Sequence, residues 1–177
     1  MKKLHLGAGS VHIAGWTNVD LFSDVRSDIY SSVLSLPFER ESFDLIYACH
    51  VLEHLNRHLI LSALTHWRDL LKEGGLLRLS VPNFKAICAH YCKTEDLGSI
   101  TGLLYGGQKF HLDSHNIVFD RKTLDESLNM VGFENDSVRW HWENTEHTQY
   151  DDYSQAYLPH MDKKNGRLMS LNIEVIK

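Results

Sequence analysis

Residues 3–20 read KLHLGAGSVHIAGWTNVD, and this stretch decides the fold. Lys3–Gly7 and Thr17–Leu21 are short apolar-rich segments bounded by glycine, serine and aspartate, which is the pattern of buried strands. Between them the turn Gly7-Ala8-Gly9-Ser10 lacks bulky side chains, so a ligand can approach its main-chain N–H groups. Asp20 closes the second strand, where an acid can accept the hydroxyl protons of a ribose. The stretch therefore predicts a ligand site at the carboxyl ends of two strands.

The spacing inside this stretch limits the kind of site. Asp20 follows Gly7 by thirteen positions, against about 20 in the dinucleotide-binding pattern, and His12 stands where that pattern has a third glycine. A dinucleotide is therefore disfavoured. The first crossover has no room for a full helix, so either it is reduced to a turn or the second strand is assigned wrongly. The simpler alternatives are a tight strand-to-loop turn and a turn-forming role for Asp20.

The rest of the chain alternates strands and helices. The expected strands are a less regular one near Asp28–Leu34, then Phe43–Cys49, Leu76–Val81, Ser137–Trp142 and Ser170–Ile176, and the expected helices are Val51–Lys72 with a break at Asn56-Arg57, Phe84–Cys92 and Lys122–Val131. This order predicts one α/β domain over residues 1–177, an open and mostly parallel sheet with helices on both faces. The two late strands are expected to pair antiparallel at one edge.

Composition excludes several classes of protein. The chain has 18 Lys and Arg against 23 Asp and Glu, a net charge of −5, and no basic run, so we expect no nucleic acid partner. Its apolar stretches are far shorter than the ~20 residues of a membrane span, so no membrane segment is expected. Three cysteines without a pairing pattern, and no leader-like segment, favour a cytoplasmic location.

The chain resembles the class I S-adenosylmethionine-dependent methyltransferases over about half of its length. No single motif decides the resemblance, which depends on their order and spacing over roughly residues 3–84. It is most similar to the short predicted methyltransferases that often accompany surface-polysaccharide assembly. The motifs are Leu4–Gly9, Gly15–Asp20, Leu36-Pro37-Phe38, Ser42–Tyr47, His50–Leu55, Leu71–Gly75 and Leu79–Pro82.

The resemblance implies a Rossmann-like, doubly wound sheet with a reversed terminal strand, and S-adenosylmethionine as the cofactor. It places Gly7 and Gly9 beside the methionine moiety and Asp20 at the ribose, and it also makes Ala8 and Leu21 cofactor-binding residues. Ser32 and Val33 would flank the adenine, and Cys49 and His50 would close the pocket. Three positions depart from the family pattern: His5 replaces an acid that orients the cofactor amino group, Val11 replaces a third glycine, and Ser32 replaces an acid that faces the adenine.

The expected reaction is methyl transfer to a small molecule, with a sugar or nucleotide-sugar hydroxyl as the expected acceptor. Such an acceptor must lose its proton, and a histidine is the usual base. His111 and His115 follow the fifth strand and its helix on a segment long enough to reach the site, with Asp113 as an orienting partner. The alternative for both histidines is an exposed loop without a chemical role.

Two other functions compete with this reading. His50, Glu53 and His54 fit the H-x-x-E-H pattern of a zinc hydrolase, but no carboxylate ligand downstream can be singled out, so we expect no metal ligands. A methyltransferase-like binding module without catalysis is the other alternative, favoured by His5 and by the absence of a covering N-terminal helix. Because little precedes the first strand to cover the cofactor, a homodimer is also expected.

Overall fold

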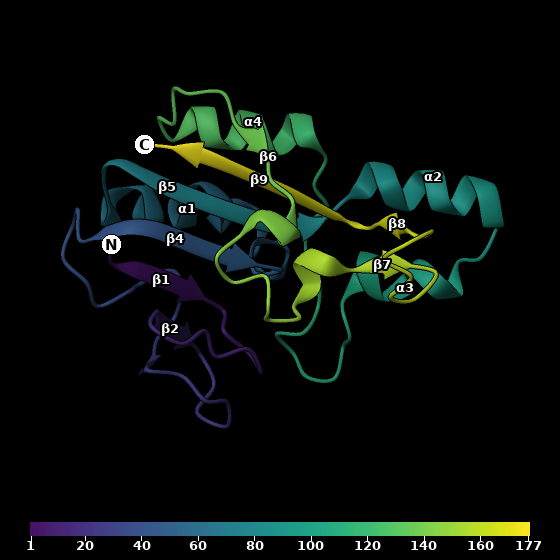
Figure 1. Ribbon diagram of the computed structural model, residues 1–177, viewed down its shortest axis with the longest axis horizontal. Helices are drawn as coiled ribbons and strands as arrows, with labels where there is room; N and C mark the ends of the chain where they lie inside the picture. The colour runs from purple at the N-terminus through teal and green to yellow at the C-terminus, as the bar shows by residue number, and fades with distance from the viewer.

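The computed structural model describes the whole chain, Met1–Lys177, as one sheet with helices around it (Figure 1). Seven strands lie in the order β3-β2-β1-β4-β5-β9-β6. Strands β1 to β5 are mutually parallel, and β9 runs antiparallel to both of its neighbours, β5 and β6. The bounds are β1 Lys3–Leu6, β2 Thr17–Asp20, β3 Ile29–Tyr30, β4 Phe43–Cys49, β5 Leu71–Pro82, β6 Val138–Arg139 and β9 Ser170–Ile176.

The predicted α/β class is confirmed: the sheet is mostly parallel, with a reversed strand near one edge. The residues 7–16 between β1 and β2 form turns, so the first crossover indeed has no helix. The helices are α1 (Ile60–Leu70), α2 (Phe84–Thr94), α3 (Gly98–Tyr105) and α4 (Arg121–Met130), and the 3-10 helices are η1 (Leu52–His54), η2 (Arg57–Leu59), η3 (Trp142–Asn144) and η4 (Tyr153–Gln155). A separate two-stranded hairpin consists of β7 (Tyr157–Leu158) and β8 (Arg167–Leu168).

The apolar core lies on one face of the sheet, under α1 and α4. Alternate residues of β1, β4, β5 and β9 point into it, as the period of two requires. Trp67 of α1 is fully buried there, and its Nε1–H donates to the Val33 carbonyl at 2.8 Å. Burying a side chain of this size stabilises the fold by roughly 3 kcal/mol. This layer fixes the positions of the strand ends.

The opposite face of the sheet corrects one expectation, because no α-helix covers it. Residues 11–16 and 140–155 cover it instead with turns, η3 and η4, and Trp16, Tyr47 and Trp140 form a second, smaller apolar cluster there. A helix that would pack on this face is missing because the short crossover between β1 and β2 cannot hold one. The expectation of helices on both faces is therefore wrong.

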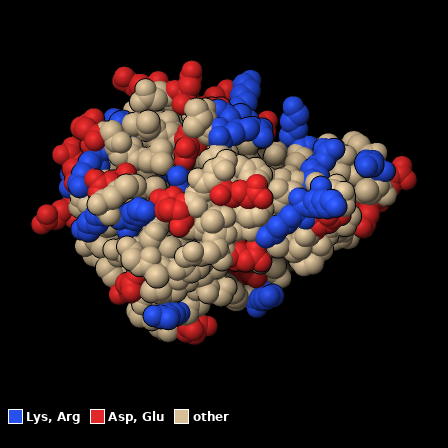
Figure 2. All heavy atoms as spheres, in the orientation of Figure 1, with Lys and Arg blue, Asp and Glu red and all other residues tan.

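The carboxyl ends of β1, β2, β4 and β5 lie at one edge of the molecule, where α2, α3 and the β7–β8 hairpin extend the structure (Figure 1). The N- and C-termini lie at the opposite edge (Figure 1). Figure 2 shows acidic and basic side chains mixed over the face turned to the viewer. No helix of the structure is both long and apolar enough to cross a bilayer.

Candidate functional site

The turn after β1 presents two glycines with different roles. Gly7 has φ +64°, and a Cγ methyl of Val51 occupies the place where a side chain would begin. Gly9 has φ +50°, and nothing lies within 4 Å of the position that its Cβ would take. Gly7 is thus required by packing and by backbone conformation, whereas Gly9 leaves an open approach to the main chain.

Asp20 is oriented by two main-chain N–H groups. Gly9 N donates to Asp20 Oδ2 at 2.8 Å, and Phe22 N donates to Asp20 Oδ1 at 3.0 Å. The residue is 8% exposed. Because each carboxylate oxygen can accept more than one hydrogen bond, both retain acceptor capacity for a pair of hydroxyl groups. The predicted pair of glycine turn and acid is therefore in direct contact.

The segment that follows β3 lies beside the end of β2. Ser31 N donates to the Asp20 carbonyl at 2.8 Å, which sets this segment against the strand. The Ser32 hydroxyl accepts from Leu34 N at 3.2 Å, and the Val33 carbonyl is held by Trp67. Leu21 is 50% exposed. Ser32 and Val33 are thus positioned by the core, and Leu21 lies at the surface.

Cys49 and His50, adjacent at the end of β4, point in different directions. Cys49 packs into the second-face cluster, and burial raises the pKa of its thiol well above the usual value. His50 has φ +52°, a backbone conformation that costs a non-glycine residue roughly 1–3 kcal/mol and clusters at functional sites. Its Nε2 lies 3.0 Å from Ser170 Oγ, and its Nδ1 lies 3.1 Å from Glu53 Oε1.

The loop of residues 106–115 reaches the strand that carries Asp20. Phe110 meets Phe22 edge to face, with ring centroids 5.1 Å apart. His115 Nδ1 lies 3.0 Å from the Leu103 carbonyl, and burial lowers the pKa of this histidine. His111 is exposed. The loop therefore contacts the segment that follows β2.

Asp113 is not hydrogen-bonded to either histidine of this loop. Its Oδ2 accepts from Lys109 N at 3.1 Å, and its carbonyl accepts from Gln108 N at 2.9 Å. Gly106 and Gly107 leave the space that these groups occupy. The contacts of Asp113 thus shape the loop.

His5, which stands where the family pattern has an acid, lies on the opposite face of the sheet from the main apolar core. Its Nδ1 lies 3.1 Å from Asn18 Oδ1, and its ring stacks on Tyr47 with centroids 5.4 Å apart. Burial lowers the pKa of His5. The Tyr47 hydroxyl donates to Asp152 Oδ2 at 2.7 Å. His5 and Tyr47 therefore tie the sheet to the segment that covers it.

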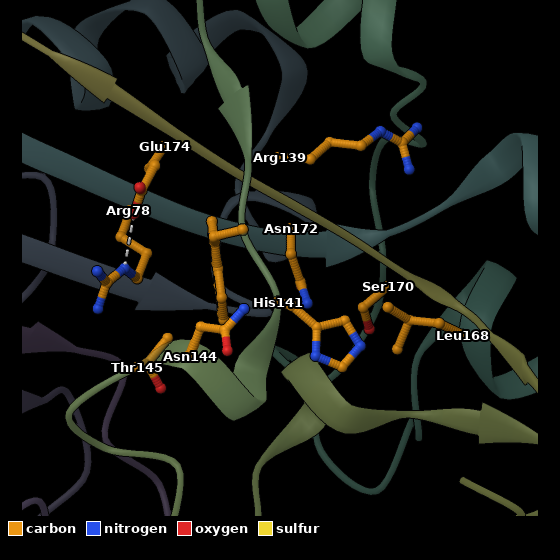
Figure 3. A pocket seen from close by; sticks show the side chains of 10 residues that line it. Arg78, Arg139, His141, Asn144, Thr145, Leu168, Ser170, Asn172 and Glu174 are labelled. Atoms are coloured by element: carbon orange, nitrogen blue, oxygen red, sulfur yellow. Dashed lines mark hydrogen bonds and ion pairs between the residues drawn. The ribbon is translucent and has the colours of Figure 1, made fainter. Parts of the chain in front are cut away.

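A polar cavity of about 450 Å³ lies on this second face, between β9 and the segment after β6 (Figure 3). Arg78 pairs with Glu174 at 3.0 Å and with Glu146 at 2.8 Å. Burial opposes the charge of Glu146, yet the hydrogen bonds from Arg78 and Lys3 lower its pKa to about 2. The lining residues are Arg78, Arg139, Trp140, His141, Asn144, Thr145, Leu168, Ser170, Asn172 and Glu174.

Neither this cavity nor a second one of about 420 Å³ beside α4 is lined by Gly7, Gly9 or Asp20. The polar cavity does include Ser170, the hydroxyl that contacts His50. Through Ser170 it borders His50, the residue that follows β4.

Three side chains that sequence analysis did not group lie together beyond β4. Single ligand atoms of Glu53, His54 and His115 all lie within 4.8 Å of one another. Glu53 and His54 belong to the H-x-x-E-H pattern, but His115 comes from the distant loop. No local sequence pattern singles out this third residue.

Two further side chains, Ser170 and Tyr153, lie beside His50, and sequence reasoning missed Ser170. The Tyr153 ring lies 5.3 Å from the His50 ring, centroid to centroid, and is 69% exposed. Ser170 opens β9 opposite Pro82, at the carboxyl end of β5. The bounds of β9 were predicted from the sequence. Ser170 could therefore have been identified as the first residue of that strand.

Comparisons with known proteins give one family match and several structures of the same fold. A family model described as a methyltransferase domain matches residues 4–79. A search of curated proteins returns no match.

Solved structures share the fold at low identity. An S-adenosylmethionine-dependent methyltransferase from Thermotoga maritima has a TM-score of 0.61 and 15% identity, covering 99% of this chain and 82% of that one. One from Archaeoglobus fulgidus has the same TM-score and identity, covering 99% and 86%. The 1,6-didemethyltoxoflavin-N1-methyltransferase of Burkholderia thailandensis, solved with S-adenosylhomocysteine, has a TM-score of 0.59 and 19% identity, covering 99% and 70%. Residues 4–79 therefore match the methyltransferase-domain family model, and the chain as a whole has the fold of these S-adenosylmethionine-dependent methyltransferases.

Proposed function

We propose that this protein transfers a methyl group from S-adenosylmethionine to a hydroxyl oxygen of a small molecule. The observation that carries the proposal is the contact between Gly9 and Asp20, which joins an open glycine turn to an oriented carboxylate at the strand ends. When bound, the cofactor supplies a sulfonium methyl group, which the acceptor oxygen takes as the carbon–sulfur bond breaks and the hydroxyl proton leaves.

The residues of the strand ends would hold the cofactor. Gly7, Ala8 and Gly9 border the methionine moiety, and Asp20 accepts the two ribose hydroxyls. Leu21, Ser32 and Val33 flank the adenine, with Ser32 contributing main-chain groups because its hydroxyl is used locally. Cys49 contributes through its main chain, since its side chain packs inward, and His50 closes the pocket.

The acceptor would lie between His50 and the 106–115 loop. His111 or His115 takes the hydroxyl proton, and positioning of the acceptor supplies most of the rate. The exposed ring of Tyr153 beside His50 supports a sugar or nucleotide sugar, because an aromatic face suits the apolar face of a sugar ring.

A second copy of the chain is part of the same proposal. No helix follows β1 to cover the glycine turn, and Leu21 beside this turn is half exposed. A homodimer contact here would exclude water from the cofactor site. Size-exclusion chromatography with light scattering measures the molecular mass directly. A monomer at working concentration would contradict the proposed homodimer.

The test is turnover with methyl-labelled S-adenosylmethionine and a panel of nucleotide sugars, simple sugars and amines. The proposal expects label in an ether of a hydroxyl acceptor. Transfer to amines alone contradicts the oxygen acceptor. Cofactor binding without transfer to any acceptor supports the non-catalytic binding module instead.

A further inference from the structure

We propose that Glu53, His54 and His115 form a binding site for a divalent transition-metal ion such as Zn²⁺, placed beside the methyl-transfer site. The three ligand atoms lie within 4.8 Å of one another. Two ligands that share one ion at about 2.1 Å lie at most about 4.2 Å apart, so small side-chain rotations bring all three into range. Two imidazoles and one carboxylate are the ligand set of catalytic zinc sites that keep one position open.

The buried carboxylate of Glu53 indicates that a ligand is needed here. Glu53 is 0% exposed, and neither of its oxygens has a hydrogen-bond partner. His50 Nδ1 lies 3.1 Å from Oε1 but is not aligned for a hydrogen bond. Nδ1 of His54 is likewise buried without a partner. Buried polar atoms are rarely left unpaired, and a bound cation would satisfy all three atoms at once.

The main chain brings His115 to the other two residues. Asn116 N donates to the Glu53 carbonyl at 2.7 Å, and Asn116 Nδ2 donates to the His54 carbonyl at 2.9 Å. These two bonds fasten the end of the 106–115 loop to η1. The rings of His54 and His115 consequently meet edge to face, with centroids 4.8 Å apart.

A neighbouring carbonyl sets the tautomer of His115. Its Nδ1 lies 3.0 Å from the Leu103 carbonyl, which can only accept, so Nδ1 carries the hydrogen and Nε2 offers its lone pair. Metal-binding histidines typically donate their second N–H in this way, which fixes the ring and raises its basicity. Glu53 has a comparable support in the chain of contacts from Ser170 through His50.

The location connects the ion to the proposed reaction. Val51, which packs against Gly7, precedes Glu53 by two residues, so the site lies immediately beyond the glycine turn. The open position of the ion would bind the acceptor oxygen and ease the loss of its proton. His115 then acts through the ion, and His111 remains free to take the proton. This role in catalysis rests on the proposed function, whereas the metal site itself does not.

The experiment titrates Co²⁺ and Zn²⁺ into metal-free protein, with Co²⁺ absorption reporting the ligands and calorimetry reporting the affinity. We expect one ion per chain, with at least about 10-fold weaker binding in Glu53→Gln and in His115→Ala. His58→Ala is the matched control, because His58 is exposed on the adjacent η2 and is expected to keep wild-type affinity. His115→Ala changes a partly exposed loop residue, so it keeps the test valid if Glu53→Gln does not fold.

Unchanged affinity in both variants, or no stoichiometric ion in the wild type, overturns the metal site. Titration of S-adenosylhomocysteine into the metal-free protein separates the two proposals. Metal binding without nucleoside binding would contradict the proposed function and leave the metal site intact. Nucleoside binding without metal binding would do the reverse.

Discussion

The rings of Phe22 and Phe110 meet edge to face, with their centroids 5.1 Å apart. Phe22 also donates its N–H to Asp20, so the contact ties the 106–115 loop to the residue that orients the carboxylate. One aromatic pair thus connects this loop to the segment that follows β2, between residues almost ninety positions apart.

Replacing Phe110 by alanine should loosen this loop. Phe110 is 49% exposed, so the melting temperature should change little, whereas affinity for S-adenosylhomocysteine should fall about 5-fold, as expected for loss of an aromatic pair of about 1 kcal/mol. Tyr105→Ala is the control, because Tyr105 is similarly exposed and has no aromatic partner. Equal effects of the two substitutions in calorimetry would contradict a specific role for the pair.

A methyl group at Gly9 should block cofactor binding, while the loss of unfolding free energy should be no larger than at another glycine of positive φ. Gly9→Ala and Gly15→Ala both place a side chain at positive φ with nothing within 4 Å, so each should cost about 1 kcal/mol of unfolding free energy. Only Gly9→Ala should weaken S-adenosylhomocysteine binding, by about 10-fold or more. Parallel loss of affinity in Gly15→Ala would indicate a general effect of destabilisation.

Gly7→Ala should destabilise the fold more strongly than Gly9→Ala. The new methyl group would collide with the Val51 side chain in addition to the strain of positive φ. Removing that side chain in the double variant Gly7→Ala/Val51→Ala should restore part of the loss, and urea unfolding of the four proteins gives the coupling. Additive free energies would show that the two residues do not meet.

His147 should make the protein less stable as the pH falls. Burial lowers its pKa to about 4, against 6.5 for an unperturbed histidine, and neither ring nitrogen has a partner. Between about pH 6.5 and pH 4 the unfolded chain therefore binds a proton that the folded protein does not, which costs up to about 3 kcal/mol.

His147→Phe should remove this contribution. The ring lies against Tyr47, with centroids 4.4 Å apart, so phenylalanine preserves an aromatic contact. Urea unfolding at pH 7 and pH 4.5 should show a smaller loss of stability in the variant than in the wild type. The same loss in both proteins would contradict a neutral, buried His147.

Much of the sheet was predictable because its strands have clear ends. Phe43–Cys49 and Ser170–Ile176 have the predicted bounds. Helix α3 was missed because its sequence, Gly98–Tyr105, contains two glycines and has no side-chain cap. The β7–β8 hairpin was missed because each strand has two residues, too few to show a period.

The candidate site was predictable where it depends on local sequence. Gly9 and Asp20 belong to adjacent strand ends, so topology alone brings them together. The approach of His115 to Glu53 depends on hydrogen bonds from Asn116 across more than sixty positions, which no local pattern encodes. The inward direction of the Cys49 side chain follows from the alternation of side chains along β4. The family resemblance places Cys49 at the pocket without regard to this alternation.

The most direct test of the account is a calorimetric titration of S-adenosylhomocysteine into wild type, Asp20→Asn and Asp24→Asn. Asp24 is an exposed acid four positions further along, and its substitution removes the same charge. The account predicts binding to the wild type and to Asp24→Asn, and at least about 10-fold weaker binding to Asp20→Asn, because a charge-assisted hydrogen bond contributes about 1.5–3 kcal/mol. No binding to the wild type, or equal affinity in all three folded proteins, would contradict it.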